Sequence, residues 1–331
     1  MTETLFCRSD ELTELAEPAD YVKAVEDGYR QHGNVAAEPR TKLINRSPPG
    51  MLTGYLAILP ESGYMGGYTY SAGFGERDAW FMTPLFDAES GEPLAVLDGA
   101  SMNPFKTGAA GAVAVEHLAR ADAETVGIIG SGPQARGQLQ ATATVRDLET
   151  VRVYSPTESH RQAFADEMAA RLDCQVRAVE TSREAVTESD IVITATTADE
   201  PVFDGDTLAP GTHVTAMGQY SASKRELDTI TIERSSYVPD LRERAMQDAG
   251  SFMYAVEQGV VDESQIHAEL GEVVAGKTAG RTSDDEITVF DSGGTGIETV
   301  AAAGMLYERA LAEEVGSTIS FVPASEALTG R

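Results

Sequence analysis

The chain has 331 residues, a length that allows a sizeable hydrophobic core and about two domains. Acidic residues outnumber basic ones 53 to 25, and the net charge of −28 repels nucleic acid and anionic membrane surfaces, so we expect neither as a partner. A carboxylate excess with few lysines is typical of a surface adapted to molar salt, where screening removes self-repulsion, and it therefore predicts a halophilic protein.

The cysteine and hydropathy patterns exclude further classes. Cys7 and Cys174 are too few for a disulfide framework, and neither a CxxC nor an HExxH pattern offers a metal site. The first residues, MTETLFCRSDELTEL, lack a basic region followed by an apolar one, and no apolar stretch approaches the roughly 18 residues of a membrane helix. We therefore expect a cytoplasmic protein without a metal ion or a membrane partner.

Residues 1–120 combine predicted helices with a strand-rich stretch. The segment PADYVKAVEDGYRQHG at 18–33 predicts a helix, and KTGAAGAVAVEHLARA at 106–121 has the small-residue pattern of a packed helix. Between them, residues 54–60, 63–73 and 79–99 alternate apolar and polar side chains and are broken by Gly and Pro, which indicates strands.

From about residue 122 onward, predicted strands alternate with predicted helices. The strands are expected at 125–130, 150–155, 175–179, 190–196, 211–218, 235–240 and 286–291. Such alternation indicates βαβ units and an α/β fold with a doubly wound parallel sheet. The helical pattern at 297–316 is expected to return to the first part, so the predicted domains are 1–120 with 297–331, and 121–296.

The first turn of this α/β part, GIIGSGPQARGQ, predicts a dinucleotide site. Gly130 permits a sharp turn, Gly132 lacks the Cβ that would collide with a pyrophosphate, and Ala135 lets the helix lie close to the sheet. The helix N-terminus then offers backbone N–H groups to the phosphates, although a purely structural turn is the alternative. The predicted contacts are Gly130, Ser131, Gly132, Pro133, Gln134 and Ala135.

The end of the second strand bears on which dinucleotide binds. An NAD site usually carries an acidic residue there, but this chain has Ser155, followed by Thr157 and Arg161. Hydroxyls beside a guanidinium suit a 2′-phosphate, so NADP(H) is favoured over NAD(H). The alternative is that Arg161 belongs only to the solvated first turn of a helix.

With these residues placed, the chain resembles the ornithine cyclodeaminase/mu-crystallin family from about residue 40 to residue 314. The similar stretches include PLFDAESGEPLAVLDG, KTGAAGAVAVEHLA, GIIGSGPQARGQL, GTHVTAMG and ITVFDSGGTGIE. The resemblance implies a Rossmann domain for the nicotinamide cofactor and an α+β domain, built from the N-terminal segment and the C-terminal helix, for substrate binding and dimerisation. Family members include imine and ketimine reductases, amino-acid dehydrogenases and a cyclising deaminase.

The resemblance also implies roles for single residues in substrate binding and catalysis. Arg40 in EPRTK matches a family arginine that holds the substrate carboxylate, and Lys106 stands where many members have a second arginine; for each, a surface ion pair is the alternative. Tyr68 replaces a family lysine and could donate a proton if Lys106 lowers its pKa, or it simply lines the pocket. Weaker candidates are Lys42 and Tyr70.

A catalytic aspartate common in the family is also replaced, because Gln219 and Tyr220 stand at its place. Further cofactor contacts are implied at the ends of other strands, where ligands bind in such sheets. For Ser292 the alternative is an ordinary helix cap, and for Met217 a core position. These predicted contacts are Thr196, Thr197, Met217, Gly218, Ser292 and Gly293. Thr107, beside Lys106, is expected to hold either the cofactor diphosphate or the substrate carboxylate.

The predicted function is therefore an NAD(P)-dependent oxidoreductase that interconverts a small imino acid and an amino acid. The alternatives are an ornithine cyclodeaminase that releases ammonia, and a non-catalytic protein that binds NADPH. A homodimer is expected from the family. Trp80, Phe81, Phe86 and Tyr70 could bury an apolar dimer sheet, or could form an ordinary core.

Overall fold

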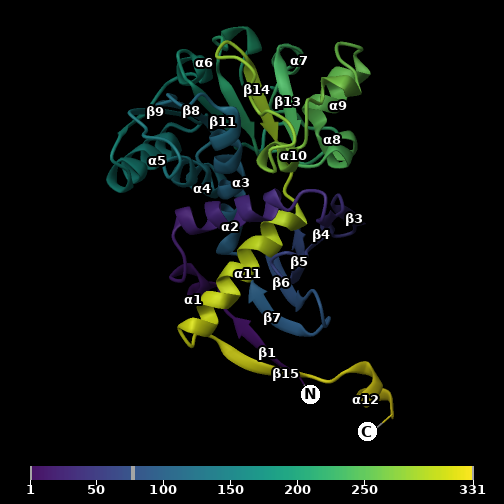
Figure 1. Cartoon of the computed structure of the whole chain (residues 1–331). Coiled ribbons are helices and arrows are strands. Elements are labelled where there is room, and N and C mark those ends of the chain that lie inside the picture. Colours follow the sequence, from purple (N-terminus) through teal and green to yellow (C-terminus); the bar gives the residue numbers. More distant parts are fainter. Residues whose placement is uncertain (1, 76–78, 330–331) are drawn as a thin grey trace. The chain divides into compact units, whose positions relative to one another are not determined.

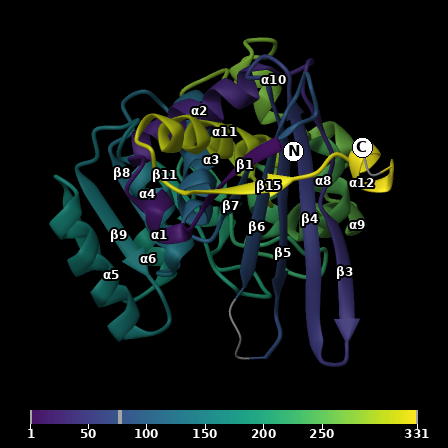
Figure 2. The same cartoon turned by 90° about the horizontal axis from the view of Figure 1, so that it is seen from below.

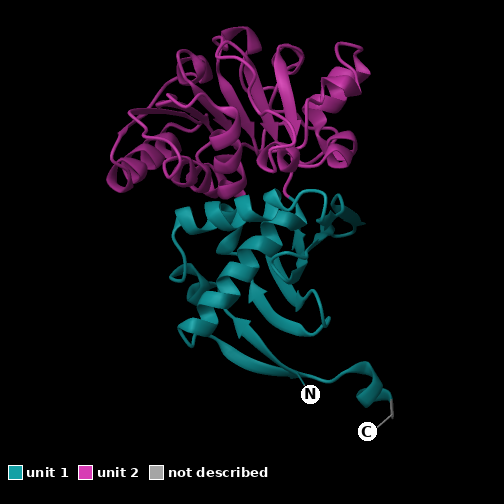
Figure 3. Ribbon diagram, viewed as in Figure 1, with its two compact units in different colours: residues 1–106, 295–331 teal, residues 107–294 magenta. Residues whose placement is uncertain are grey.

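A computed structural model describes residues 2–75 and 79–329, and the chain divides into two compact units. One unit comprises residues 1–106 with 295–331, and the other comprises residues 107–294 (Figure 3). The sequence placed the first boundary at 120/121, whereas the division lies within a helix at 106/107. Within the second unit, the helix that contains Gly108 packs closely against the helix that contains Gly137, since a Cβ on Gly108 would lie 2.3 Å from the carbonyl oxygen of Gly137.

The first unit is built on a mixed eight-stranded sheet in the order β15-β1-β7-β6-β5-β4-β2, with β3 paired to β4. β1 and β7 are parallel, and the other pairs are antiparallel. The strands are β1 (Thr2–Cys7), β2 (Ala36–Ala37), β3 (Thr41–Arg46), β4 (Pro49–Leu59), β5 (Tyr64–Ala72), β6 (Trp80–Asp87), β7 (Pro93–Asp98) and β15 (Ser317–Phe321). The helices are α1 (Ser9–Thr13), α2 (Pro18–Arg30), α11 (Gly296–Ala312) and α12 (Ala324–Thr329), with the first turns of α3 (Met102–Leu118).

Helices α2 and α11 pack against each other, and α11 also packs on β4, β5 and β6 (Figures 1 and 2). Small residues allow this approach, because a Cβ on Gly28 would already lie 3.1 Å from the Cβ of Ala301. The Thr295 side chain caps α11 by accepting from the N–H of Ile297. The segment after residue 294 therefore packs on the N-terminal sheet.

One side of the β4–β6 part of this sheet is exposed and apolar. Along β4 the side chains alternate, so that Tyr55 is 4% exposed and Leu56 is 61% exposed. On β6, Trp80 and Met82 are 70% and 66% exposed. They lie opposite Ser71 and Thr69 of β5, which in turn pair with Leu52 and Gly54 of β4.

The second unit is an all-parallel seven-stranded sheet in the order β10-β9-β8-β11-β12-β14-β13. Its strands are β8 (Thr125–Ile129), β9 (Thr150–Tyr154), β10 (Gln175–Ala178), β11 (Ile191–Thr194), β12 (His213–Ala216), β13 (Ser235–Pro239) and β14 (Ile287–Asp291). Its helices are α4 (Pro133–Thr142), α5 (Glu158–Arg171), α6 (Ser182–Val186), α7 (Thr229–Glu233), α8 (Arg242–Asp248), α9 (Gly250–Glu257) and α10 (Leu270–Val274), with short 3-10 turns at Gly205–Thr207 and Glu263–Gln265. The predicted fold class, a doubly wound parallel sheet plus an α+β domain, is confirmed.

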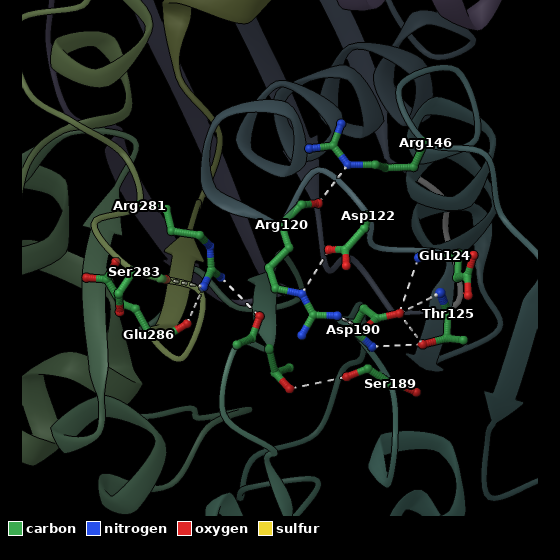
Figure 4. Close-up of polar contacts among 12 residues, drawn as sticks. Arg120, Asp122, Glu124, Thr125, Arg146, Ser189, Asp190, Arg281, Ser283 and Glu286 are labelled. Carbon is green, nitrogen blue, oxygen red and sulfur yellow. Dashed lines mark hydrogen bonds and ion pairs between the residues drawn. The ribbon is translucent and has the colours of Figure 1, made fainter.

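The amino ends of these strands are joined by a polar network (Figure 4). The carboxylate of Asp190, just before β11, accepts from Arg120 at 2.7 Å and from the N–H and hydroxyl of Thr125. Arg146 and Arg281 donate to backbone carbonyls, including those of Val115 and Leu118 at the end of α3, and Arg146 also pairs with the Glu116 carboxylate at 2.6 Å. This edge of the sheet is thereby held by structural contacts, and the carboxyl ends of the strands are the edge to consider for ligands.

In the part of the chain that the structure describes, no helix is long and apolar enough to cross a membrane. Over the same described residues, no three His, Cys, Asp or Glu side chains are grouped in a way that could hold a metal ion.

Candidate functional site

The turn between β8 and α4 has the geometry expected of a dinucleotide fingerprint. Gly130 has a φ of +119°, and a Cβ there would lie 2.3 Å from the carbonyl oxygen of Ala195, so the fold itself requires this glycine. Gly132 differs, because a Cβ there would meet no protein atom within 4 Å among the described residues. Gly132 is also the N-cap of α4 and makes no side-chain capping bond.

The open space at Gly132 and the uncapped start of α4 are features of a phosphate-binding site. Open space in front of a helix N-terminus without a side-chain cap leaves backbone N–H groups for an anion. Pro133 occupies the first turn and Ala135 is fully buried against the sheet. Residues 130–135 therefore fit the pyrophosphate of a dinucleotide.

At the end of β9, Ser155 is buried and Thr157 is the N-cap of α5 without a side-chain capping bond. The guanidinium of Arg161 turns back over this loop and donates to the carbonyl of Ser155 at 3.0 Å. Arg161 is thus placed at the strand end where a dinucleotide ribose is recognised in such sheets.

The loops after β11 and β12 are joined by a carboxylate that the sequence did not single out. Glu226 accepts from the Thr194 hydroxyl at 3.1 Å and from the N–H groups of Thr196 and Gly218 at 2.7 Å each. Burial raises the pKa of Glu226 to about 7, although these hydrogen bonds oppose the rise. In sequence, Glu226 is one acidic residue among 53 in a polar segment, so no local pattern identified it.

Gln219 belongs to the same loops. Its amide donates to the carbonyls of Thr196 and Ala198, at 3.1 and 2.7 Å, so the side chain that replaces the family aspartate closes the loop after β11. Met217 is buried beneath it. Thr107, at the start of the second unit, accepts through its carbonyl from Gln138 at 2.8 Å.

The segment after β14 is held by a second buried network. The Asp240 carboxylate accepts from the Ser292 hydroxyl at 2.7 Å and from the N–H of Gly293 at 3.0 Å. Arg244 bridges Asp240 and Asp291 at 2.7 and 2.9 Å. Burial raises the pKa of Asp291, against the lowering by Arg244. The alternative interpretation of Ser292 as the helix cap is wrong, because Thr295 caps α11.

The first unit gathers the predicted substrate-binding residues around Tyr55. The Lys106 ammonium lies 2.8 Å from a Glu298 carboxylate oxygen and donates to the Tyr55 hydroxyl at 3.2 Å. The Arg40 guanidinium lies 5.2 Å from the centre of the same ring. Burial lowers the pKa of Lys106, but Glu298 and Tyr55 outweigh it and hold it above its usual value. Two cations and one carboxylate therefore share one aromatic cluster.

Tyr68 belongs to this cluster, 4.9 Å from Lys106 to the ring centre, and its hydroxyl donates to the side-chain oxygen of Asn103. The expectation that Lys106 lowers its pKa is wrong. Burial and the neighbouring hydroxyl of Tyr55 raise the pKa of Tyr68 well above its usual value, and Glu298 already pairs with the lysine. Tyr68 is thus a protonated phenol at neutral pH.

The weaker candidates are also placed. Lys42 is half-buried in β3, and the Tyr70 ring stacks on Phe81 with centroids 4.8 Å apart. Neither Glu298 nor Tyr55 was identified from the sequence. Glu298 lies 192 residues from its partner Lys106, and only the folded chain brings the two together.

The chain is similar in sequence and fold to several known proteins. Delta(1)-pyrroline-2-carboxylate reductase from Bacillus cereus is 39% identical over 238 residues, which cover 72% of this chain and 73% of that protein. The structure of Delta(1)-pyrroline-2-carboxylate reductase from Thermococcus litoralis, in complex with NADH and L-proline, has a TM-score of 0.91 and 34% identity, covering 96% of this chain and 100% of that one. An archaeal alanine dehydrogenase dimer with bound NAD gives a TM-score of 0.90 and 33% identity, covering 97% and 100%.

These relatives define a class of NAD(P)-dependent imino-acid reductases and amino-acid dehydrogenases. The ornithine cyclodeaminase/mu-crystallin family matches residues 2–314, and the chain belongs to this family. The predicted family and the predicted kind of enzyme are confirmed. For the cofactor, the solved relatives hold NADH or NAD, which agrees with a nicotinamide dinucleotide and leaves the preference for NADP(H) a prediction. The roles of individual site residues also stay predictions.

Proposed function

We propose that this protein interconverts a small imino acid and the corresponding amino acid with a nicotinamide dinucleotide. The open space in front of Gly132, at the uncapped start of α4, supports this most directly. A glycine that no protein contact requires there points to a ligand that approaches the backbone closely, as a pyrophosphate does. When bound, the cofactor supplies or accepts a hydride at the carbon of the C=N bond.

For the dinucleotide, we favour NADP(H). Ser155 leaves the end of β9 without the carboxylate that holds the two ribose hydroxyls of NAD. Arg161 lies at the same strand end and could pair with a 2′-phosphate by leaving the carbonyl of Ser155. The other contacts proposed for the cofactor are residues 130–135, Thr107, Thr157, Thr196, Thr197, Met217, Gly218, Ser292 and Gly293.

For the substrate, we propose that Arg40 and Lys106 bind the carboxylate. Lys106 is paired with Glu298 beside the Tyr55 ring, and the Arg40 guanidinium lies over the same ring. Guanidinium and ammonium groups are the side chains suited to binding a carboxylate. The aromatic rings of Tyr55, Tyr68 and Tyr70 then offer apolar contacts to a small side chain or ring.

Imine reduction also needs one proton at nitrogen for each hydride at carbon. Tyr68 keeps its proton at neutral pH and its hydroxyl donates to Asn103, so we propose water as the proton source, with Tyr68 able to donate to the substrate only by leaving Asn103. A cyclodeaminase would instead need a residue that activates water after oxidation. Gln219 is an amide engaged by two carbonyls, which disfavours that reaction here.

The test is a panel of substrates with both reduced cofactors, at low salt and in molar KCl. Delta(1)-pyrroline-2-carboxylate, its six-membered homologue, and pyruvate with ammonium are supplied, and the loss of reduced nicotinamide absorbance is followed. We expect turnover of at least one substrate, faster with NADPH than with NADH. Cofactor binding without turnover on any substrate would support a non-catalytic protein, and ammonia release from ornithine would support the cyclodeaminase. Failure to bind either nucleotide would overturn the proposal.

We further propose a cytoplasmic homodimer formed through the exposed apolar side of β4 and β6. Leu56, Trp80 and Met82 are 61%, 70% and 66% exposed on a chain whose net charge is −28, and an apolar patch on so acidic a protein favours a covered interface. Leu56→Glu is expected to yield a monomer in light scattering after size exclusion. Leu328→Glu, a change at a residue 86% exposed in α12, serves as the control and is expected to leave the dimer intact. A Leu56→Glu protein with the dimer mass would refute this interface.

A further inference from the structure

Glu226 connects the carboxyl ends of two adjacent strands. β11 and β12 are hydrogen-bonded neighbours, with Thr194 paired to Ala216. The loop after β11 begins with Ala195 and the loop after β12 begins with Met217. The carboxyl group of Glu226 accepts hydrogen bonds from the Thr194 hydroxyl and the Thr196 N–H on the β11 side, and from the Gly218 N–H on the β12 side.

The contacts of this carboxyl group are matched to a negative charge. Two of its three partners are backbone N–H groups, which only donate, and the third is a hydroxyl that can donate. Gly218 must be a glycine for this approach, because a Cβ there would lie 2.4 Å from Glu226 Oε1. A glutamine amide or a protonated carboxyl group at position 226 would turn a hydrogen toward the N–H groups of Thr196 and Gly218, which can only donate.

The surroundings of Glu226 contain one further ionisable group on the elements packed against it. A small cavity is lined by Ala216, Gln219, Glu226, Ala249, Gly250, Ser251 and Asp291. Asp291, at the end of β14, is paired with Arg244, whereas the sequence neighbour Arg225 pairs outward with Glu200. Gln219 and Ser251 are uncharged, and the Ser251 hydroxyl accepts from the N–H of Leu227. No cation that the structure describes is ion-paired with Glu226, so backbone donors hold its charge.

We propose that ionised Glu226 is the positioning residue that fixes the loops after β11 and β12 for the nicotinamide cofactor. This rests on the proposed function, in which Thr196 and Gly218 contact the cofactor. The hydrogen bonds from Thr196 and Gly218 to one carboxylate hold the two loops in a fixed arrangement before the cofactor binds. Loss of these bonds lets the loops separate, and cofactor affinity falls because the loops must then be ordered on binding. Glu226 is buried and need not touch the cofactor itself.

Because burial places the pKa of Glu226 at about 7, the charge that holds the loops is present above neutral pH and is lost below it. Protonation removes an acceptor from donors that have no other partner in this cluster. Cofactor affinity is therefore expected to weaken as the pH falls from 8 to 6, whereas a merely structural residue would give a pH-independent affinity.

The experiment measures the dissociation constants of NADH and NADPH by calorimetry between pH 6 and pH 8.5, together with KM for the imino acid. Glu226→Gln removes the charge at nearly constant shape. We expect about a tenfold weaker cofactor at pH 8, a flattened pH dependence, and a substrate KM within about twofold of the wild type. Thr194→Val keeps the carboxylate and removes one donor, and it is expected to weaken the cofactor about threefold.

Asp228→Asn is the matched control. Asp228 lies two residues away and also accepts backbone N–H groups, from Gly205 and Thr231, but it caps α7 rather than the strand loops. It is expected to lower the Tm without changing cofactor affinity. Wild-type affinity and pH dependence in Glu226→Gln, or an equal loss in Asp228→Asn, would overturn the proposal. If Glu226→Gln does not fold, an unchanged cofactor affinity in Thr194→Val would overturn the proposal. A wild-type protein that binds neither nucleotide refutes the proposed function instead.

Discussion

The buried ion pair of Lys106 and Glu298 allows a quantitative prediction for the first unit. Both side chains are about 1% exposed or less, and their charged atoms are 2.8 Å apart. At an effective dielectric constant of about 20, their Coulomb attraction is about 6 kcal/mol. The desolvation of both ions offsets much of it, so removing one partner alone is expected to cost about 3–5 kcal/mol, because it leaves the other charge buried and uncompensated.

The perturbation is a double-mutant cycle with Lys106→Met, Glu298→Gln and the double variant. Each single change is expected to lower the free energy of unfolding by about 3–5 kcal/mol. The double change is expected to lower it by much less than the sum, because it leaves no uncompensated charge. The chain has one tryptophan, Trp80, and it lies in β6 of the same unit, so its fluorescence during urea unfolding reports on this unit.

Additive single effects, or single effects below about 1 kcal/mol, would refute this reasoning. Such a result would mean that the charges are solvated in the folded protein.

Three further predictions follow from the second unit. Gly132→Ala should keep the wild-type Tm but weaken NADPH binding about tenfold by calorimetry, because its Cβ enters open space that the pyrophosphate needs. Gly130→Ala should instead lower the Tm, because φ is +119° and the new Cβ would lie 2.3 Å from the carbonyl oxygen of Ala195. Equal effects of the two changes on Tm and on affinity would contradict this. The pKa of Glu226 rises from 4.5 to about 7 on folding, so the folded state holds its proton more tightly and stability is lost as the pH rises between these values, by about 3 kcal/mol. Glu226→Gln lacks this contribution, so the difference in the free energy of unfolding between wild type and variant should change by about 3 kcal/mol between pH 4.5 and about pH 7, and a constant difference over this range would contradict the shift. Ser155→Asp should favour NADH over NADPH in the ratio of kcat/KM, and an unchanged ratio would remove Ser155 from cofactor selection.

The fold was predictable because its signals are local. The central strands β8 (TVGII) and β11 (IVIT) are apolar runs, and the turn at Gly130 and Gly132 is recognisable from about a dozen neighbouring residues. The resemblance to a known family supplied Arg40 and Lys106. Local patterns of this kind can be recognised in the sequence without knowing any long-range contact.

The electrostatics of the site were not predictable in the same way. The pKa of Tyr68 depends on burial and on Tyr55, and the charge of Lys106 is balanced by a glutamate 192 residues away. Glu226 and Asp240 are equally inconspicuous, because a chain with 53 acidic residues does not reveal which few are buried. Burial, and therefore pKa, is a property of the folded chain.

The arginines at the amino edge of the parallel sheet have a consequence for how the protein responds to ionic strength. Arg146 donates to the carbonyl of Arg120, and Arg281 donates to that of Ser283 (Figure 4). They also donate to the carbonyls of Val115 and Leu118, and Arg146 has one carboxylate partner, Glu116. Backbone carbonyls are dipoles without net charge, so dissolved ions screen these bonds far less than they screen paired surface charges. A change in ionic strength is therefore expected to affect the exposed carboxylates more than the bonds between guanidinium groups and backbone carbonyls at this edge of the sheet.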